Sequence, residues 1–348
     1  MSNYPLSYRL SWLPRFLKPS LGGNARGFAS SGGMLLASPP KRTARLAFLG
    51  DISAVANNRA PAVDPAIRAL LSSADLVLGN CESPVVEKPR AALRTVLGTH
   101  HAMTGRFLAE ALEAAGIAPD RLVLSLANNH ALDQGTEGFA ETLATLDRLG
   151  IRTIGTRAAA PVERVMIEGV TIGFGAFTLW RNAGEAQFSE CVSMEADPER
   201  WPPDAASGVD LLCAMPHCDW EFRHFPRPET RNLARRLSGQ GFGLVVGGHA
   251  HVVQPVEWLD ATLVSYCLGD FFGTAFAHQP WPGRIGGILS VDVSADADTR
   301  GAIAAYAMRF FFRLRDGRRE RLVPVEALTG PLRAKVEARI DAVFRAAL

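Results

Sequence analysis

Short apolar runs that each end in polar residues recur along this chain, and they constrain its fold more than any other feature. The clearest runs are "RLAFLGDIS", "DLVLGNCES", "RLVLSLANNH", "VDLLCAMPHCD" and "FGLVVGGHAH". Runs of this length and composition predict buried strands. Amphipathic segments with helical spacing lie among them, at 64–73, 105–117, 136–151 and 228–240. Strands that alternate with helices predict an α/β domain.

The second half of the chain is richer in strand-like runs, such as "GGILSVDVS" and "AYAMRFFFRLR", and a terminal amphipathic helix follows from residue 333. This predicts either one mixed sheet or two packed sheets. A chain of 348 residues is long enough for a sizeable buried core. We expect a main domain over 45–348, after a loosely ordered leader over 1–44.

The polar residues that end the runs are the types that bind metal ions. They are Asp51, Asn80-Cys81-Glu82, Asn128-Asn129-His130, His217 and His249-Ala250-His251. Ligands gather at the carboxyl ends of strands in open α/β sheets, and so many buried ionisable groups are costly unless they are paired or bind metal. Imidazole with carboxylate and amide oxygen suits Mn, Fe or Zn, with Mg as an alternative.

The spacing of these residues allows them to serve one metal or two neighbouring metals. On an extended segment, His249 and His251 would point to one face, because side chains alternate along a strand. A carboxylate such as Glu82 can bridge two metals. Two metals about 3.5–4 Å apart form a clamp for the attacking and leaving oxygens of a displacement at phosphorus.

Composition narrows the class of partner and the compartment. Lys and Arg number 37 against 35 Asp and Glu, so the net charge of +2 gives no reason to expect nucleic acid or an acidic surface as the main partner. The five Cys are an odd and scattered set, which predicts reduced thiols in the cytoplasm. No run approaches the roughly 18–20 apolar residues of a membrane-spanning helix. Within the leader, "YRLSWLPRFLK" has an alternative reading as a peripheral membrane contact, although Pro14 weakens a helix there.

Six motifs in order give the chain a resemblance to a known family. They are "FLGDIS", "LGNCES", "SLANNHALDQG", "PHCDWE", "GGHAHVVQ" and "YCLGDFF". They resemble the pattern of the CapA family of capsule and poly-gamma-glutamate synthesis proteins over about residues 45–293. That family is similar to the calcineurin-like metallophosphoesterases, whose core is a double-sheet α/β/β/α sandwich. The resemblance therefore implies that fold and a binuclear metal centre.

The resemblance also implies roles for individual residues. Asp51 and His251 match ligands of a first metal, Asn129, His217 and His249 match ligands of a second, and Glu82 matches the bridging acid. His130 matches a proton donor beside the leaving group. Four more residues are expected to bind substrate or to hold the ligands in place: Asn80, Asn128, Asp133 and Glu221.

The chain departs from the family pattern at several positions. Ser53 stands where the wider superfamily has a histidine, and Asp270 stands in place of a usual asparagine. Cys81 flanks a presumed ligand, so a thiolate ligand is an alternative to a small apolar neighbour. The His100-His101 pair is either a substrate contact or, as loop composition favours, part of a solvated loop.

The leading hypothesis is a metal-dependent hydrolase of a phosphoester or phosphoanhydride, with a metal-activated hydroxide as nucleophile and His130 as general acid. Its substrate would be a small molecule or polymer that carries phosphate or carboxylate. One alternative is hydrolysis or transfer at an amide or gamma-glutamyl bond. Another is a non-catalytic accessory role in assembling a polyanionic capsule or poly-gamma-glutamate.

Overall fold

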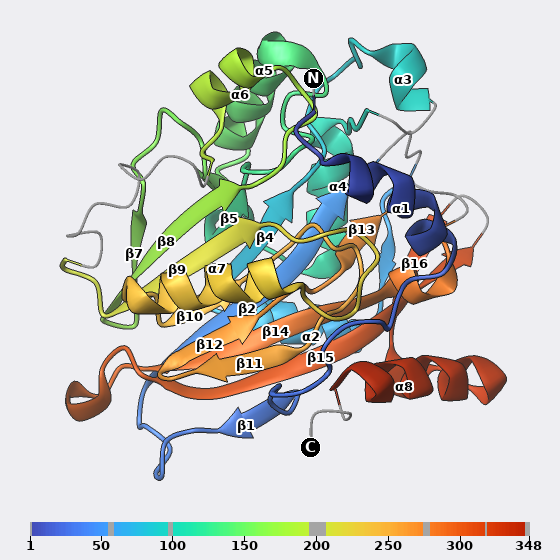
Figure 1. Cartoon of the computed structure of the whole chain (residues 1–348). Coiled ribbons are helices and arrows are strands. Elements are labelled where there is room, and N and C mark those ends of the chain that lie inside the picture. The colour runs from blue at the N-terminus through green and yellow to red at the C-terminus, as the bar shows by residue number, and fades with distance from the viewer. Residues whose placement is uncertain are drawn as a thin grey trace.

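Two β-sheets form the centre of the molecule (Figure 1). The computed structural model describes residues 2–54, 59–96, 100–194, 207–273, 279–316 and 319–344. The larger sheet has ten strands, in the order β3 (Ala62–Val63), β16 (Arg319–Pro324), β15 (Ile303–Asp316), β14 (Ile285–Ser294), β2 (Thr43–Ser53), β4 (Leu76–Cys81), β5 (Leu122–Ser125) and β6 (Arg152–Ile154), with β1 (Gly32–Met34) beside β15 and β13 (Asp270–Gly273) beside β2. Strands β2, β4, β5 and β6 run parallel to their neighbours in this series.

The smaller sheet has six strands, in the order β11 (Val256–Leu259), β12 (Thr262–Ser265), β10 (Leu244–Val246), β9 (Leu211–His217), β8 (Val170–Thr178) and β7 (Glu163–Ile167). Strands β8, β9, β10 and β12 are parallel. Helices cover the outer faces of the sheets or lie at their ends: α1 (Leu6–Leu17), α2 (Pro65–Ser72), α3 (Ala92–Val96), α4 (Gly105–Ala115), α5 (Gly135–Arg148), α6 (Glu185–Cys191), α7 (Pro228–Gly239) and α8 (Gly330–Phe344).

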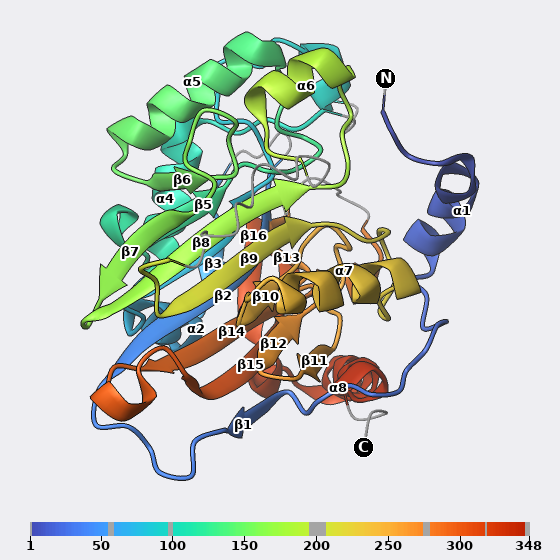
Figure 2. The same ribbon diagram turned by 60° about the vertical axis from the view of Figure 1, so that its left-hand side comes forward.

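Alternation along β9 shows how the layers pack. Leu211, Cys213 and Met215 face the core that the two sheets share. The intervening Leu212 and Ala214 pack in a second cluster with the apolar side chains of α7. Side chains alternate across a strand, so β9 is buried on both faces. Figure 2 shows α7 on the outside of the smaller sheet and α4 and α5 beside the larger one. The predicted α/β/β/α arrangement is confirmed.

Helix boundaries follow from local chemistry. Asp64 accepts a hydrogen bond from the Ala66 amide at the start of α2, and Pro65 occupies the first turn. Thr104 caps α4 in the same way through the Phe107 amide, and Gly116 ends that helix with a φ of 72°. The helices predicted over 64–73 and 105–117 therefore form where the sequence signals place them.

Two regular elements lie within residues 1–44, the segment expected to be a loosely ordered leader. Residues 6–17 form α1, and β1 pairs with β15. Tyr8 and Phe28 are buried, because their rings pack on the main body. Apolar contacts of this kind offset the entropy cost of ordering a terminal segment. No helix of the described residues is long and apolar enough to cross a membrane.

Candidate metal centre

The carboxyl ends of strands from both sheets meet at one edge of the molecule, and strand register aligns their polar residues. Asp51 on β2 lies opposite Asn80 on β4 and opposite Asp270 on β13. His217 ends β9, and His249 follows β10. A Cβ on Gly50 would collide with the carbonyl oxygen of Gly269, so only glycine lets β2 approach β13 this closely.

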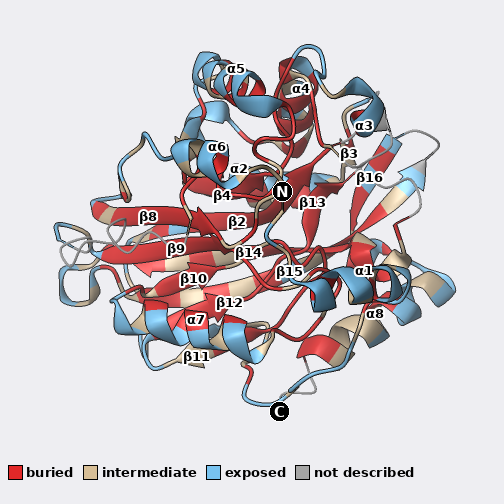
Figure 3. Cartoon of the chain, turned by 45° about the horizontal axis from the view of Figure 1, so that its top comes forward, coloured by how far each residue is buried: buried red, intermediate tan, exposed pale blue. Residues whose placement is uncertain are grey.

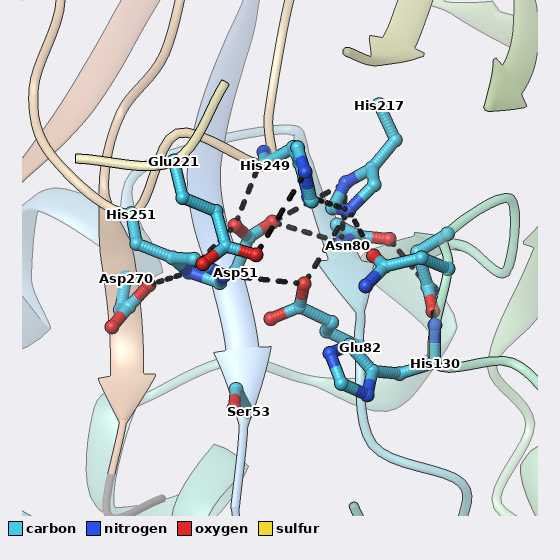
Figure 4. A network of polar contacts seen from close by, with 12 residues as sticks. Asp51, Ser53, Asn80, Glu82, His130, His217, Glu221, His249, His251 and Asp270 are labelled. Carbon is cyan, nitrogen blue, oxygen red and sulfur yellow. Dashed lines mark hydrogen bonds and ion pairs between the residues drawn. The ribbon is translucent and has the colours of Figure 1, made fainter. Parts of the chain in front are cut away.

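The predicted ligands converge on Glu82 (Figure 4). Its Oε1 lies 3.4 Å from His217 Nε2 and 3.6 Å from His251 Nε2. Four of its neighbours form two groups with it, and the two groups share only Glu82. Asp51 and His217 belong to one group, and His249 and His251 belong to the other. In each group the potential ligand atoms lie within 4.8 Å of one another. Glu82 belongs to both, which is the position of a bridging ligand.

Asn129 completes the set from the loop after β5. Its Oδ1 lies 2.9 Å from His217 Nε2. His217 Nε2 also lies 3.1 Å from His249 Nδ1. The structure thus brings all six predicted ligands into one buried cluster: Asp51, Glu82, Asn129, His217, His249 and His251.

Unpaired atoms in this cluster test whether a metal would fit. Within the described chain, neither carboxylate oxygen of the fully buried Glu82 has a hydrogen-bond partner, nor does His249 Nε2. Buried polar atoms are normally hydrogen-bonded, because an unpaired one costs free energy. A divalent cation would satisfy these atoms, and imidazole with carboxylate is a donor set for Mn, Fe or Zn. The residues present fit divalent metal.

Burial dominates the acid–base properties of the cluster when no metal is present. It raises the pKa of Glu82 to about 8. Burial together with the nearby Glu82 charge raises the pKa of Asp51 to about 7. Burial lowers the pKa of His217 to about 4. For His251 burial acts in the same direction, but the carboxylates of Glu82 and Asp270 outweigh it and raise its pKa. Burial therefore favours the neutral forms of Glu82, Asp51 and His217, and His251 is the exception because carboxylates lie close to it.

This electrostatic arrangement predicts an unusual pH dependence of stability in protein treated with a chelator. From about pH 6.5 to 8 the free energy of unfolding should fall, because folded Glu82 and Asp51 hold protons that unfolded carboxyls have already lost above about pH 4.5. The low pKa of His217 has the opposite effect on stability, but only below about pH 6.5, where histidine in the unfolded chain takes up protons.

Chemical denaturation at several pH values would measure this slope. Bound metal should reverse it, because its ligands must be deprotonated. If the free energy of unfolding of the chelator-treated protein rises from pH 6.5 to 8, the raised pKa values of Glu82 and Asp51 are contradicted.

The backbone at His249 and His251 differs from the extended segment that the sequence predicted. Both residues lie in bends with positive φ, 84° and 52°. A non-glycine residue rarely takes this conformation, and such strain concentrates at functional sites. The two imidazoles are consequently tilted by 53° rather than parallel, with ring centres 6.0 Å apart. The bend in the backbone, and not the alternation of side chains along a strand, therefore places both imidazoles near Glu82.

Two of the four predicted supporting residues hold other side chains in place. Asn80 donates a 2.8 Å hydrogen bond to Asp51 Oδ1. Asn128 donates to Asn80 Oδ1 at 3.1 Å, and its own oxygen accepts from the His130 amide at 3.1 Å. A continuous chain of hydrogen bonds therefore runs from Asp51 to the backbone of His130.

Asp133 orients His130. Its Oδ2 lies 2.6 Å from His130 Nδ1 and accepts a 2.7 Å hydrogen bond from the amide of His101. Burial raises the pKa of Asp133 to about 6 and lowers that of His130. A carboxylate on one ring nitrogen fixes the ring, so that the other nitrogen is available for the site.

Glu221, the last predicted supporting residue, lies beside His249. Its Oε1 is 3.9 Å from His249 Nε2, and its Oε2 accepts a hydrogen bond from the indole of Trp12 on α1. Arg15 donates to its backbone oxygen at 2.9 Å. Tyr4 also stacks over the ring of His249, with ring centres 6.0 Å apart. The N-terminal segment therefore contacts this side of the cluster. Figure 3 shows α1 at the surface, with both buried and exposed residues along it.

Sequence reasoning missed His101, which is buried rather than part of a solvated loop. Its ring lies parallel to that of His130, with centres 3.6 Å apart, and its Nδ1 is 3.5 Å from Ser53 Oγ. An imidazole from another segment of the chain therefore lies beside Ser53. The sequence showed the histidine pair at 100–101, but no local pattern in it indicated this packing.

Sequence reasoning also gave Asp270 no role. Its Oδ1 lies 2.7 Å from His251 Nδ1, and its Oδ2 accepts a 2.9 Å hydrogen bond from Arg313. Arg313 is buried and also pairs with Glu320 at 3.1 Å. Asp270 thereby orients a predicted metal ligand, as carboxylates behind ligating histidines do. Its position as the first polar residue of "GDFF" was a usable signal, whereas the distant Arg313 gave none.

Arg313→Met should destabilise the protein by about 3–5 kcal/mol, because it leaves two buried carboxylates, Asp270 and Glu320, without their cation. Urea denaturation would measure this loss. The matched control is Arg45→Met, which breaks a half-exposed 2.8 Å pair with Asp292 and should cost at most about 1 kcal/mol. Equal losses in the two variants would show that the buried pairing is unimportant.

Cys81 supplies no ligand to this cluster. Burial raises the pKa of its thiol to about 12, and its Sγ contacts the Ser83 carbonyl oxygen at 3.4 Å. No cysteine belongs to the potential metal-binding groups of the described residues. A protonated, buried thiol is a small apolar neighbour.

Comparison with known proteins places the chain in a family. A family model described as "Bacterial capsule synthesis protein PGA_cap" matches residues 45–274. The chain belongs to this family. The match spans strands β2 to β13 and therefore every element that supplies a residue to the candidate centre. The resemblance drawn from six motifs is thus confirmed.

Two curated proteins are similar to this chain over part of its length. The PGA biosynthesis protein CapA of Bacillus subtilis (strain 168) is 30% identical over 220 residues, which are 60% of this chain and 55% of that protein. The capsule biosynthesis protein CapA of Bacillus anthracis is 25% identical over 214 residues, 58% of this chain and 51% of that protein. The chain spans about half the length of these relatives.

Solved structures with a similar chain path include a novel phosphatase from Mycoplasma pneumoniae, at 12% identity and a TM-score of 0.46, over 77% of this chain and 94% of that one. A second is the NAD nucleotidase of Haemophilus influenzae, at 15% identity and a TM-score of 0.40, over 86% of this chain and 56% of that one.

Proposed function

We propose that this protein is a metal-dependent hydrolase that cleaves a phosphoester or phosphoanhydride bond. The observation that carries the proposal is Glu82, a fully buried carboxylate among three imidazoles and a second carboxylate. Within the described residues, neither of its oxygens has a hydrogen-bond partner. Burying a carboxylate without hydrogen-bond partners is costly, so a purely structural role for Glu82 does not explain why it lies here. Two cations at this place would satisfy Glu82 and its neighbours.

Six residues would hold the metals: Asp51, Glu82, Asn129, His217, His249 and His251. When bound, two divalent cations would polarise a phosphoryl oxygen and lower the pKa of water, which supplies a nucleophile at neutral pH. Asp51 is held by Asn80, and His251 is held by Asp270, so both ligands are oriented before a metal arrives.

His130 would deliver a proton to the departing oxygen. Its ring is fixed by Asp133 at one nitrogen and by the parallel ring of His101 on one face. The imidazole is neutral in the free protein because burial lowers its pKa. A phosphate group brings negative charge close to it, which favours the protonated ring, and Asp133 stabilises that form.

A panel of phosphomonoesters, phosphodiesters and gamma-glutamyl peptides, each tested with Mn, Fe, Zn and Mg, examines this proposal. We expect release of product from at least one phosphorus ester, dependent on added metal and abolished by chelator. Activity confined to gamma-glutamyl peptides would support the second candidate below. Inactivity on the whole panel by metal-loaded protein would favour an accessory role.

The second candidate is hydrolysis or transfer at a gamma-glutamyl or other amide bond. It is favoured by the names of the relatives, one of which is a PGA biosynthesis protein and the other a capsule biosynthesis protein. The same metals would polarise an amide carbonyl. We rank it second because only about half of each relative is matched, and an accessory role in polymer assembly shares the same support.

A further inference from the structure

The outer face of α1 carries an uncovered row of leucines. Leu6, Leu10, Leu13 and Leu17 are 56–73% exposed. Their spacing of four, three and four residues places them along one side of the helix. Large exposed apolar side chains that stand singly are normal, but a continuous row of them marks a surface that binds a partner or a membrane.

The opposite face of α1 is fixed to the main body. Trp12 donates a hydrogen bond to Glu221, and the guanidinium of Arg15 lies over the rings of Tyr8 and Trp220. Tyr8 and Arg15 are buried. The contacts of Tyr8, Trp12 and Arg15 therefore fix the orientation of α1. With this orientation, the leucine row faces away from the main body.

Charge around the row identifies the kind of partner. All 35 acidic residues of the chain lie after Gly50, whereas the first 44 residues carry six Lys or Arg. Arg9 and Lys18, within and directly after α1, are exposed, as is Arg26 further along. Long cationic side chains beside a leucine row can reach phosphate groups while the leucines enter the acyl region.

A second copy of the same helix fits this face less well. A coiled coil needs at least three or four heptads, and α1 has only 12 residues with Pro14 inside it. Two such helices would also bring Arg9 and Lys18 near their own copies without any acidic partner. Like charges would oppose this contact, whereas an anionic surface would attract it.

We propose that the leucine row of α1 docks on an anionic lipid surface, with Arg9 and Lys18 at the headgroups. Because the inner face of α1 contacts Glu221 and its segment covers His249, docking places the candidate metal centre about one helix diameter, roughly 10 Å, from the lipid. The proposal concerns the α1 surface alone and does not depend on the hydrolase activity.

Vesicle co-sedimentation of the full chain tests this proposal. We expect binding to vesicles of phosphatidylcholine with phosphatidylglycerol, weaker binding to phosphatidylcholine alone, and weakening by salt. The double variant Leu10→Asn with Leu13→Asn should bind the anionic vesicles at least about tenfold more weakly. Its matched control is Leu93→Asn with Met166→Asn, which changes two residues of similar exposure, 73% and 74%, and should bind as the wild type does.

Three results would overturn the proposal. They are no binding to anionic vesicles, equal binding by the α1 variant and the wild type, and a lipid-free dimer that the α1 variant converts to a monomer. The last result, read by light scattering, would assign the leucine row to a second copy of the chain. Circular dichroism of both variants verifies that each remains folded.

Discussion

His130→Ala should lower the turnover of an unactivated phosphoester by roughly two to four powers of ten while the metals stay bound. The side chain lies beside the predicted ligands without belonging to the groups that contain Glu82. Its Nδ1 is occupied by Asp133 at 2.6 Å, which leaves the other nitrogen to protonate a leaving oxygen. Loss of that proton donor should slow chemistry and spare metal affinity.

Leaving-group dependence separates this role from a binding role. Nitrophenolate needs little protonation to depart, so the deficit of His130→Ala should shrink on nitrophenyl esters. The control His224→Asn removes another buried imidazole, one that contacts the Val253 carbonyl oxygen at 2.9 Å instead of this cluster. That control should retain near-normal turnover. A His130 variant that loses metal, or that is equally slow on both kinds of ester, would remove the general-acid assignment.

Glu82→Gln should have opposite effects on stability in the absence and presence of metal. In chelator at pH 8 the variant should be more stable by about 1–3 kcal/mol, because it removes a buried charge whose oxygens have no hydrogen-bond partner. With added Mn or Zn, the wild type should gain stability from binding, and the variant should gain little.

Urea denaturation of both proteins, each with chelator and with metal, measures this reversal. The change is nearly isosteric, so packing around residue 82 is preserved and the charge is the variable. Asn80 serves as the comparison, because Asn80→Ala removes a 2.8 Å hydrogen bond to Asp51 and should destabilise the protein in chelator. If Glu82→Gln is also the less stable protein in chelator, Glu82 is a structural carboxylate.

Sequence predicted which side chains lie together wherever a residue comes at the end of a buried strand. Asp51, Glu82 and His217 come at the carboxyl ends of β2, β4 and β9, and parallel strands bring such ends to one edge. Periodicity locates these strands, and the helix caps at Asp64 and Thr104 are local signals. These parts of the fold depend on short-range chemistry that a single sequence displays.

The parts that sequence missed depend on distant partners. Arg313 reaches Asp270 across 43 residues of chain, and no local pattern pairs them. The bends that turn His249 and His251 toward Glu82 have positive φ, which tertiary contacts impose against local preference. The contact of the leader with the main domain had no local signal, because Trp12 finds its partner, Glu221, more than two hundred residues away.

Elemental analysis of purified protein tests the central claim most directly. After loading with Mn, Fe or Zn and removal of excess ions, the wild type should hold about two divalent ions per chain. His249→Ala removes one ligand and should reduce that content, because loss of a ligand weakens the site by orders of magnitude. A wild-type protein that retains none of these metals under any loading condition would contradict the assignment of this cluster as a metal centre.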